Sequence, residues 1–218
     1  MIKLYSGTPG SGKSLHLART IYWQLRLKHH VICNFPINLD VVDKWKEYFH
    51  YVPNEKLSSD YLKKFSLEVF NERRIKEDEI FLIIDESQML FNARDWQKSD
   101  RRGWLEFFTV HRHYGYSIIL VAQFDQMLDK QVRSLIEYEL IHRKVSNYGV
   151  RGWFLMAIMC APSLFCYVTV WYPMKQKISS EFFRYRRKYG RMYDTFALFD
   201  AQRVLTPLGG NAAKVSEG

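Results

Sequence analysis

Eight residues near the amino terminus have the spacing of a loop that binds phosphate groups. The segment Gly7-Thr8-Pro9-Gly10-Ser11-Gly12-Lys13-Ser14 matches the pattern G-x-x-x-x-G-K-[ST], after a short apolar run and before a helical one. The glycines let the backbone curl so that successive N–H groups face one ligand. We expect Lys13 to reach the β- and γ-phosphates and the Ser14 hydroxyl to bind Mg²⁺. The motif therefore predicts binding of ATP with Mg²⁺.

Two carboxylates follow the continuous apolar run at 80–84. A run without polar alternation is typical of a central strand covered on both faces. Asp85 then stands at the carboxyl edge of the sheet, where α/β proteins bind ligands, and suits the acid that holds Mg²⁺ through water. Glu86 is placed to act as a general base for the attacking water. An ordinary solvated loop is the alternative, but beside a phosphate loop the pair predicts hydrolysis.

A second buried run, at 117–122, ends in Gln123. If this strand neighbours the strand that ends in Asp85, the Gln123 amide faces the γ-phosphate or the water and senses the nucleotide; a simple polar strand end is the alternative.

Arg112 and Arg133 are candidates for stabilising transition-state charge, supplied by a neighbouring subunit in a ring. Most arginines are solvated surface charges, so that interpretation stays open for both.

The remaining pattern predicts the elements that position these residues. Helical spacing at 14–28 buries Leu17, Ile21 and Leu25, with Trp23 and Leu27 widening the apolar face. Alternation of helices and buried strands predicts an α/β P-loop NTPase core over residues 1–150, with a mostly parallel sheet and helices on both faces. The expected strands are 2–5, 31–34, 79–84, 117–123 and 138–144, and the expected further helices are 41–49, 61–74, 100–114 and 128–136.

Residues 151–200 are predicted to form a small β-rich extension. The run 152–174 has no charged side chain and is long enough to span a bilayer as a helix. Two strands turning at Ala161-Pro162-Ser163 explain the same residues better, because proline disfavours a helix interior and the run after it is rich in β-branched and aromatic residues. The membrane helix remains the alternative. Residues 201–218 are predicted to be a flexible tail.

Composition and net charge indicate the kind of partner that the chain binds and the compartment in which it acts. The chain has 32 Lys and Arg against 23 Asp and Glu, a formal charge of +9, which favours anionic partners such as nucleic acid, nucleotide or an acidic membrane surface. The basic cluster 184–188, with aromatic residues interleaved, is typical of a surface that binds DNA strands or of a solvated basic surface. Three cysteines without metal-ligand spacing and a start without a secretory signal indicate the cytoplasm.

Several of these segments together resemble the zonular occludens toxin (Zot) family, the assembly and export ATPases of filamentous phages. The phosphate loop is not specific to that family, whereas His-Arg-His-x-Gly followed by a strand that ends in glutamine is much more so. The resemblance lies in residues 1–14, Leu82–Glu86, His111–Gly115, Ile118–Gln123, Asp129–Arg133 and Met192–Thr195.

The resemblance implies an ATP-hydrolysing motor at the host inner membrane that accompanies extrusion of single-stranded phage DNA. It implies ATP and Mg²⁺ as cofactors, phage DNA and other phage assembly proteins as partners, and location in the host cytoplasm or on the cytoplasmic face of that membrane. Longer members carry a membrane segment and then a periplasmic region, and neither follows residue 175. Anchorage is therefore expected to involve 152–174 or a partner, and toxin activity is not predicted. A small-molecule P-loop kinase and a non-enzymatic assembly scaffold with a nucleotide site are the alternative functions.

Overall fold

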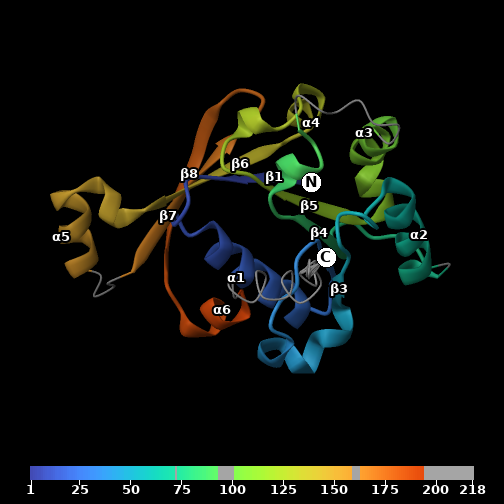
Figure 1. Ribbon diagram of the computed structural model, residues 1–218, viewed down its shortest axis with the longest axis horizontal. Coiled ribbons are helices and arrows are strands. Elements are labelled where there is room, and N and C mark those ends of the chain that lie inside the picture. Colours follow the sequence, from blue (N-terminus) through green and yellow to red (C-terminus); the bar gives the residue numbers. More distant parts are fainter. Residues whose placement is uncertain (72, 93–100, 159–162, 194–218) are drawn as a thin grey trace, which may run out of the picture.

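The computed structural model describes residues 1–71, 73–92, 101–158 and 163–193, which form one eight-stranded sheet (Figure 1). The strand order is β3-β2-β4-β5-β1-β6-β7-β8. The first six strands run parallel, β7 is antiparallel to β6, and β8 is antiparallel to β7. The strands are β1 (Ile2–Ser6), β2 (His30–Cys33), β3 (Phe49–Tyr51), β4 (Ile80–Ile84), β5 (Tyr116–Val121), β6 (Tyr138–Lys144), β7 (Leu164–Trp171) and β8 (Gln176–Arg184).

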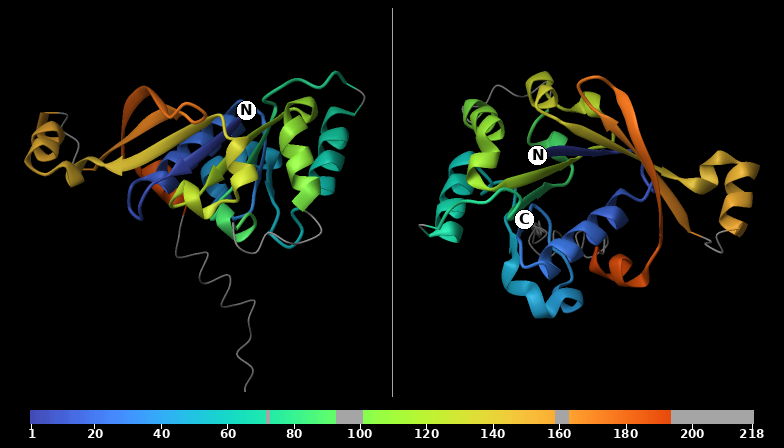
Figure 2. Two further views of the ribbon diagram at one scale, coloured as in Figure 1. Left: turned by 90° about the horizontal axis from the view of Figure 1, so that it is seen from above. Right: turned by 180° about the vertical axis from the view of Figure 1, so that it is seen from behind.

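Helices cover both faces of this sheet (Figure 2). One face carries α1 (Lys13–Arg26), η1 (Leu39–Tyr48) and α6 (Arg187–Met192); the other carries α2 (Ser59–Phe70), α3 (Arg101–Val110) and α4 (Lys130–Ser134). The connections include η2 (Ser87–Met89), η3 (His111–Tyr114), η4 (Asp125–Met127), η5 (Val145–Tyr148) and α5 (Val150–Ile158). The predicted fold class, a mostly parallel α/β sheet with helices on both faces and added C-terminal strands, is confirmed.

The central strands are buried on both faces, as their unbroken apolar sequences predict. The register pairs Ile84 with Leu120 and Tyr5 with Val121, so β4, β5 and β1 end at the same level. The three segments that leave these strand ends therefore meet at one edge of the sheet.

Helix α1 buries a narrower stripe than the sequence suggested. Leu17, Ile21 and Leu25 are fully buried, but Trp23 is 42% exposed and Leu27 61% exposed. The predicted widening of the apolar face by these two residues is wrong, because at 3.6 residues per turn they project away from the stripe.

The segment predicted as helix 41–49 is a 3-10 helix with a kink at Val42, and it runs directly into β3. The sequence pattern did not reveal β3, which is three residues long and too short to show a periodicity.

The apolar run 152–174 is part helix and part strand. Its first part forms α5, so the strand interpretation is wrong there; its last part forms β7, which turns at 172–175 into β8. Strand β7 is rich in β-branched and aromatic residues, whereas α5 combines residues of these types with leucine, methionine and alanine, which favour helix. Residues 159–162, which include most of the predicted turn, and the predicted tail 201–218 lie outside the described residues. Among the helices that the structure describes, none is long and apolar enough to cross a membrane.

A buried histidine pair fixes α1 to the sheet beneath the phosphate loop. His16 Nδ1 on α1 lies 2.8 Å from His142 Nε2 on β6, and His142 Nδ1 lies 3.2 Å from the Ser6 carbonyl oxygen. The His16 ring stacks between Tyr5 and Tyr167, with ring centroids 4.9 and 4.4 Å away. Burial lowers the pKa of His16 to about 2 and that of His142 to about 4.

We predict that this pair makes the protein sensitive to acid. The unfolded chain binds protons at these histidines below about pH 6.5, while the folded chain keeps them neutral. The free energy of unfolding should therefore fall as the pH drops from about 6.5 toward 4, by up to about 1.4 kcal/mol per pH unit for each buried histidine. Denaturant titrations across this range should show a shallower slope for His142→Gln. The exposed His113, changed to Gln, is the control; an equal slope in both variants would contradict the role of burial.

Candidate nucleotide-binding site

The phosphate loop connects β1 to α1 and has the backbone that only glycine adopts readily. Gly7, Gly10 and Gly12 have φ values of 139°, 74° and 95°. A Cβ atom at Gly12 would lie 2.6 Å from the Phe165 ring, and one at Gly7 would lie 2.5 Å from the His142 carbonyl oxygen. The Gly7 N–H donates to the Gln123 carbonyl at 3.1 Å, which ties the start of the loop to the neighbouring strand end.

Lys13 and Ser14 occupy the first turn of α1, at the positive end of its helix dipole. The Lys13 ammonium donates to the carbonyl oxygens of Gly7 and Thr8, the latter at 3.2 Å, so it lies over the loop. Partial burial lowers the pKa of Lys13, while the carboxylates of Asp85 and Glu86 raise it. A phosphate bound in this loop would meet both the ammonium and the backbone N–H groups.

Asp85 follows β4 and is held from two sides. The Asn34 side chain, which follows β2, accepts from the Asp85 N–H at 2.7 Å and donates to the Asp85 carbonyl at 2.9 Å. Burial raises the pKa of the Asp85 carboxyl, and hydrogen bonds from Tyr193 and from the Glu86 N–H oppose this effect. Asn34 and Tyr193 were not proposed as site residues from the sequence; for Asn34, its position at the end of a strand beside β4 is the signal that could have identified it.

Tyr193 brings the C-terminal part of the chain into the site. Its hydroxyl donates to Asp85 Oδ2, and its ring packs edge-on against Phe35 with centroids 5.0 Å apart. Burial raises the pKa of Tyr193, the Asp85 charge and hydrogen bond raise it further, and a hydrogen bond with Ser14 lowers it. Tyr193 thus contacts both side chains that the sequence assigns to Mg²⁺.

Glu86 adopts a left-handed backbone conformation, with φ 46° and ψ 46°. Such a conformation costs a residue other than glycine about 1–3 kcal/mol and is common at functional sites. The Glu86 side chain is exposed and accepts a hydrogen bond from Gln88, and its N–H donates to Asp85 Oδ1 at 2.9 Å. The Glu86 backbone therefore helps to hold the Asp85 carboxylate, while the Glu86 carboxylate itself stays open to solvent.

Gln123 lies where the sequence predicted, beyond β5 and between the ends of β4 and β1. It shares a cleft of about 580 Å³ with the loop, Asp85, Glu86 and Tyr193. Its predicted role as a nucleotide sensor stays a prediction.

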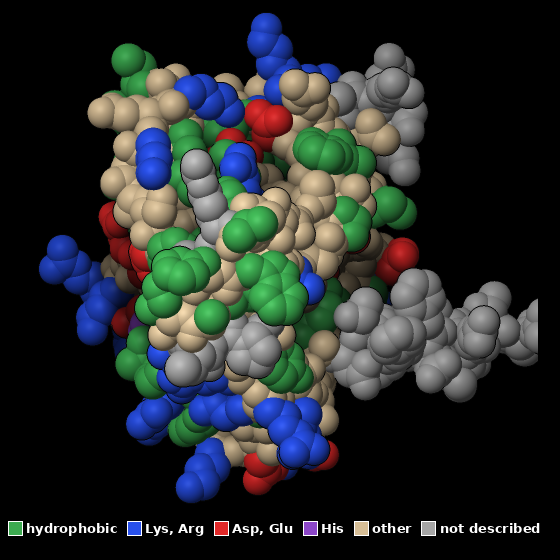
Figure 3. Space-filling model, turned by 90° about the vertical axis from the view of Figure 1, so that its left-hand side faces the viewer, with side chains coloured by type: hydrophobic (Ala, Val, Ile, Leu, Met, Phe, Trp, Pro, Cys, Tyr) green, Lys and Arg blue, Asp and Glu red, His purple; other side chains and the backbone are tan. Residues whose placement is uncertain are grey.

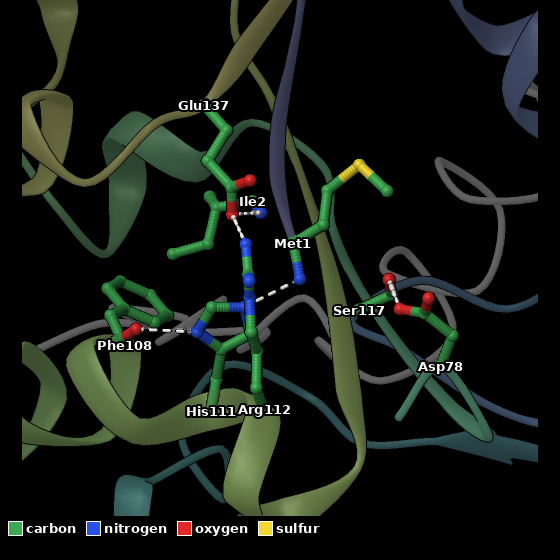
Figure 4. A network of polar contacts seen from close by, with 8 residues as sticks. All are labelled: Met1, Ile2, Asp78, Phe108, His111, Arg112, Ser117 and Glu137. Carbon is green, nitrogen blue, oxygen red and sulfur yellow. Dashed lines mark hydrogen bonds and ion pairs between the residues drawn. The ribbon is translucent and has the colours of Figure 1, made fainter. Parts of the chain in front are cut away.

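The two candidate arginines lie away from this cleft. Arg112 is at the amino end of β1, the opposite edge of the sheet, where its Nη2 donates to Glu137 Oε1 at 2.7 Å (Figure 4). There the Met1 amino group lies 2.8 Å from His111 Nε2. Arg133 is on α4, with a buried Nε that finds no hydrogen-bond partner among the described residues. Within one subunit Arg112 and Gln123 lie at opposite edges of the sheet, whereas Arg133 interacts electrostatically with Asp125, two residues beyond Gln123. The role predicted for the two arginines stays a prediction. The described residues that line the cleft include no arginine.

The cleft has the donor set that ATP and Mg²⁺ require. The backbone at Gly7, Gly10 and Gly12 leaves room for phosphates, and among the described residues the buried Ser11 Oγ has no hydrogen-bond partner. Lys13 would hold the phosphates, and Ser14 and Asp85 offer the hydroxyl and carboxylate oxygens that Mg²⁺ prefers. Bound Mg²⁺ would neutralise charge on the phosphates.

Sheet order, phosphate loop and acidic strand end together define a P-loop NTPase fold. The family model described as "Zonular occludens toxin (Zot)" matches residues 1–193, and the chain belongs to this family. The resemblance inferred from the sequence is therefore confirmed. A search of curated protein sequences finds no match.

Solved structures share the fold at low sequence identity. The N-terminal domain of zonular occludens toxin from Neisseria meningitidis is 19% identical, with a TM-score of 0.53 over 88% of this chain and 98% of that one. B204, the DNA-packaging ATPase from Sulfolobus Turreted Icosahedral Virus, is 16% identical, with a TM-score of 0.53 over 85% and 98%. The genome packaging NTPase B204 from Sulfolobus turreted icosahedral virus 2, in complex with ATP-gammaS, is 16% identical, with a TM-score of 0.51 over 84% and 96%.

We predict that the Tyr193 hydroxyl supports the metal site. Removing a group that holds a metal-binding carboxylate typically weakens metal affinity about 10- to 100-fold. Tyr193→Phe should therefore raise the Mg²⁺ concentration needed for half-maximal nucleotide binding about tenfold or more. Tyr185→Phe, at another tyrosine of the cleft, is the matched control. An unchanged or lower Mg²⁺ requirement in Tyr193→Phe would show that this hydroxyl does not support the site.

Proposed function

We propose that this protein is an ATP-hydrolysing motor of the Zot type that acts in filamentous-phage assembly and in export of single-stranded phage DNA. The convergence of Lys13, Asp85 and Glu86 in one cleft supports hydrolysis most directly. Membership of the family supports the biological setting, and the fold shared with a DNA-packaging ATPase of a virus is consistent with it.

Each residue has a definite part in the proposed reaction. Lys13 and the loop N–H groups bind the phosphates and stabilise the charge that develops on them. Ser14 and Asp85 hold the metal. Glu86 accepts the proton of the attacking water, and Gln123 reports the state of the γ-phosphate to β5.

Two variants separate binding from hydrolysis. Lys13→Ala should abolish nucleotide binding, because the loop loses its cation. Glu86→Gln should keep binding but slow phosphate release about a hundredfold or more, because the amide cannot take a proton. Phosphate release without any acceptor and binding of a fluorescent ATP analogue are the measurements. Met89→Ala, which changes a side chain that is 74% exposed in the adjoining turn, is the control.

The same experiments distinguish the alternatives. A small-molecule kinase would release little phosphate without an acceptor and transfer it to one when present. A scaffold with a nucleotide site would support phage export even as Lys13→Ala. Loss of phosphate release and of export together in Lys13→Ala is the outcome expected of a motor.

A ring is proposed because the cleft needs a cation that no described lining residue supplies beyond Lys13. The candidates are Arg112 and Arg133 from a neighbouring copy. We predict that the arginine variant that removes hydrolysis, but not ATP binding, regains activity when mixed with Lys13→Ala, whose arginines are intact. A protein that stays monomeric with ATP and DNA, or mixtures that stay inactive, would exclude the ring.

A basic, aromatic cleft supports single-stranded DNA as the partner. Its volume is about 660 Å³, and arginines alternate there with rings that bases can stack on. Among the residues that line it are Arg19, Trp23, Phe182, Arg184, Tyr185 and Arg186. Other phage assembly proteins, and a location in the host cytoplasm or at the cytoplasmic face of the inner membrane, complete the proposal.

A further inference from the structure

Helix α5 stands apart from the body of the protein (Figures 1 and 2). It lies beyond the ends of β6 and β7, on the far side of the molecule from α2 and α3. Its side chains are large, apolar and open to solvent: Val150 is 87% exposed, Trp153 70%, Phe154 69% and Ile158 65%. Hydrophobic side chains gather in the centre of the face that Figure 3 shows. A contiguous exposed patch of this kind marks an interaction surface.

The helix is held in this exposed position by specific packing. Gly152 lies so close to η5 that a Cβ atom there would be 2.0 Å from the Val145 carbonyl oxygen. Met156 packs on a small cluster formed by Val145, Leu164 and Cys166, separate from the two main cores. The tight contact at Gly152 and this separate cluster fix the base of the helix, while its apolar stripe points away from the protein.

The charge of this region selects an anionic partner. Residues 140–180 contain no Asp or Glu. Arg143 and Lys144 end β6, directly before η5 and α5, whereas Lys175 lies at the other end of β7 and forms ion pairs with Asp125 and Glu139. The flanking acids are engaged elsewhere: Glu139 accepts from Ser6 Oγ at 2.7 Å, and Glu181 accepts from the Tyr167 hydroxyl. A second copy docking arm to arm would bring like charges together. Exposed Trp and Phe with cations beside them are the combination that binds the surface of an anionic bilayer.

We propose that α5 and the preceding Tyr148 form an arm that inserts into the cytoplasmic leaflet of an anionic membrane. Nine residues of helix extend about 13 Å, against a hydrocarbon core of about 30 Å, so the arm enters one leaflet and does not span. The inference rests on the proposed function at the cytoplasmic face of the membrane. It assigns the contact with lipid to α5, which contains the first part of the apolar run 152–174.

Flotation of the full-length protein with lipid vesicles tests the arm. It should float with vesicles of phosphatidylethanolamine and phosphatidylglycerol and much less with pure phosphatidylcholine. Trp153→Glu should weaken binding about tenfold or more, because a charge replaces an inserted ring. The matched control is Leu67→Glu on α2, which places the same charge at a side chain that is 62% exposed and should bind like the wild type. Replacing Arg143 and Lys144 with Gln should weaken binding to the anionic vesicles only.

A conservative variant, Trp153→Phe, tests whether misfolding explains the loss of vesicle binding in Trp153→Glu. Trp153→Phe should still float, but should lose part of the fluorescence quenching that brominated lipids cause in the wild type. Wild-type protein that does not float, or Trp153→Glu that floats as well as Leu67→Glu, would overturn the proposal. A changed oligomeric state in Trp153→Glu with unchanged flotation would assign the arm to a second copy instead. Phosphate release in solution is measured in parallel. Failure of vesicle binding together with normal hydrolysis would exclude the membrane arm but not the proposed ATPase function.

Discussion

Ile84 pairs with Leu120 and Tyr5 with Val121, and the rest of the site depends on this register. It brings the ends of β4, β5 and β1 to one level, so that Asp85, Gln123 and the phosphate loop share one cleft although they are far apart in the sequence. A shift by one residue would turn every side chain of a strand to the other face. The hydrogen bond from the Gly7 N–H to the Gln123 carbonyl extends the register into the loop itself.

Two opposite charges at the cleft, those of Asp85 and Lys13, are partly shielded from solvent. Burial raises the pKa of Asp85 and lowers that of Lys13, and each of the two charges partly offsets the effect on the other. Neutral donors hold the arrangement: Asn34 fixes the Asp85 backbone and Tyr193 bonds its carboxylate. Because Tyr193 follows α6, the segment beyond β8 belongs to the site and does more than extend the sheet.

Strands β6, β7 and β8 and helix α5 carry parts of two surfaces that nucleotide binding does not explain. One part is a cleft with arginines and aromatic rings, and another is the apolar arm; Figure 3 shows Lys and Arg side chains below the apolar centre of this face. Phe165 on β7 also contacts the Gly12 position of the phosphate loop. The same strands thus connect the nucleotide, the proposed DNA surface and the proposed membrane arm.

The sequence by itself determined the phosphate loop, the acids at the end of β4, Gln123, the family and the parallel core, because local spacing and unbroken apolar runs encode them. It could not reveal Tyr193 or Asn34 as partners of Asp85, since those contacts join segments distant in the chain. Nor could it reveal that Arg112 and Gln123 lie at opposite edges of the sheet, because β5 spans the sheet between them. The run 152–174 fits a strand or a helix equally by hydrophobicity, and only packing decides: pairing with β6 makes 164–171 a strand, and the close contact of Gly152 with η5 supports a helix at 150–158.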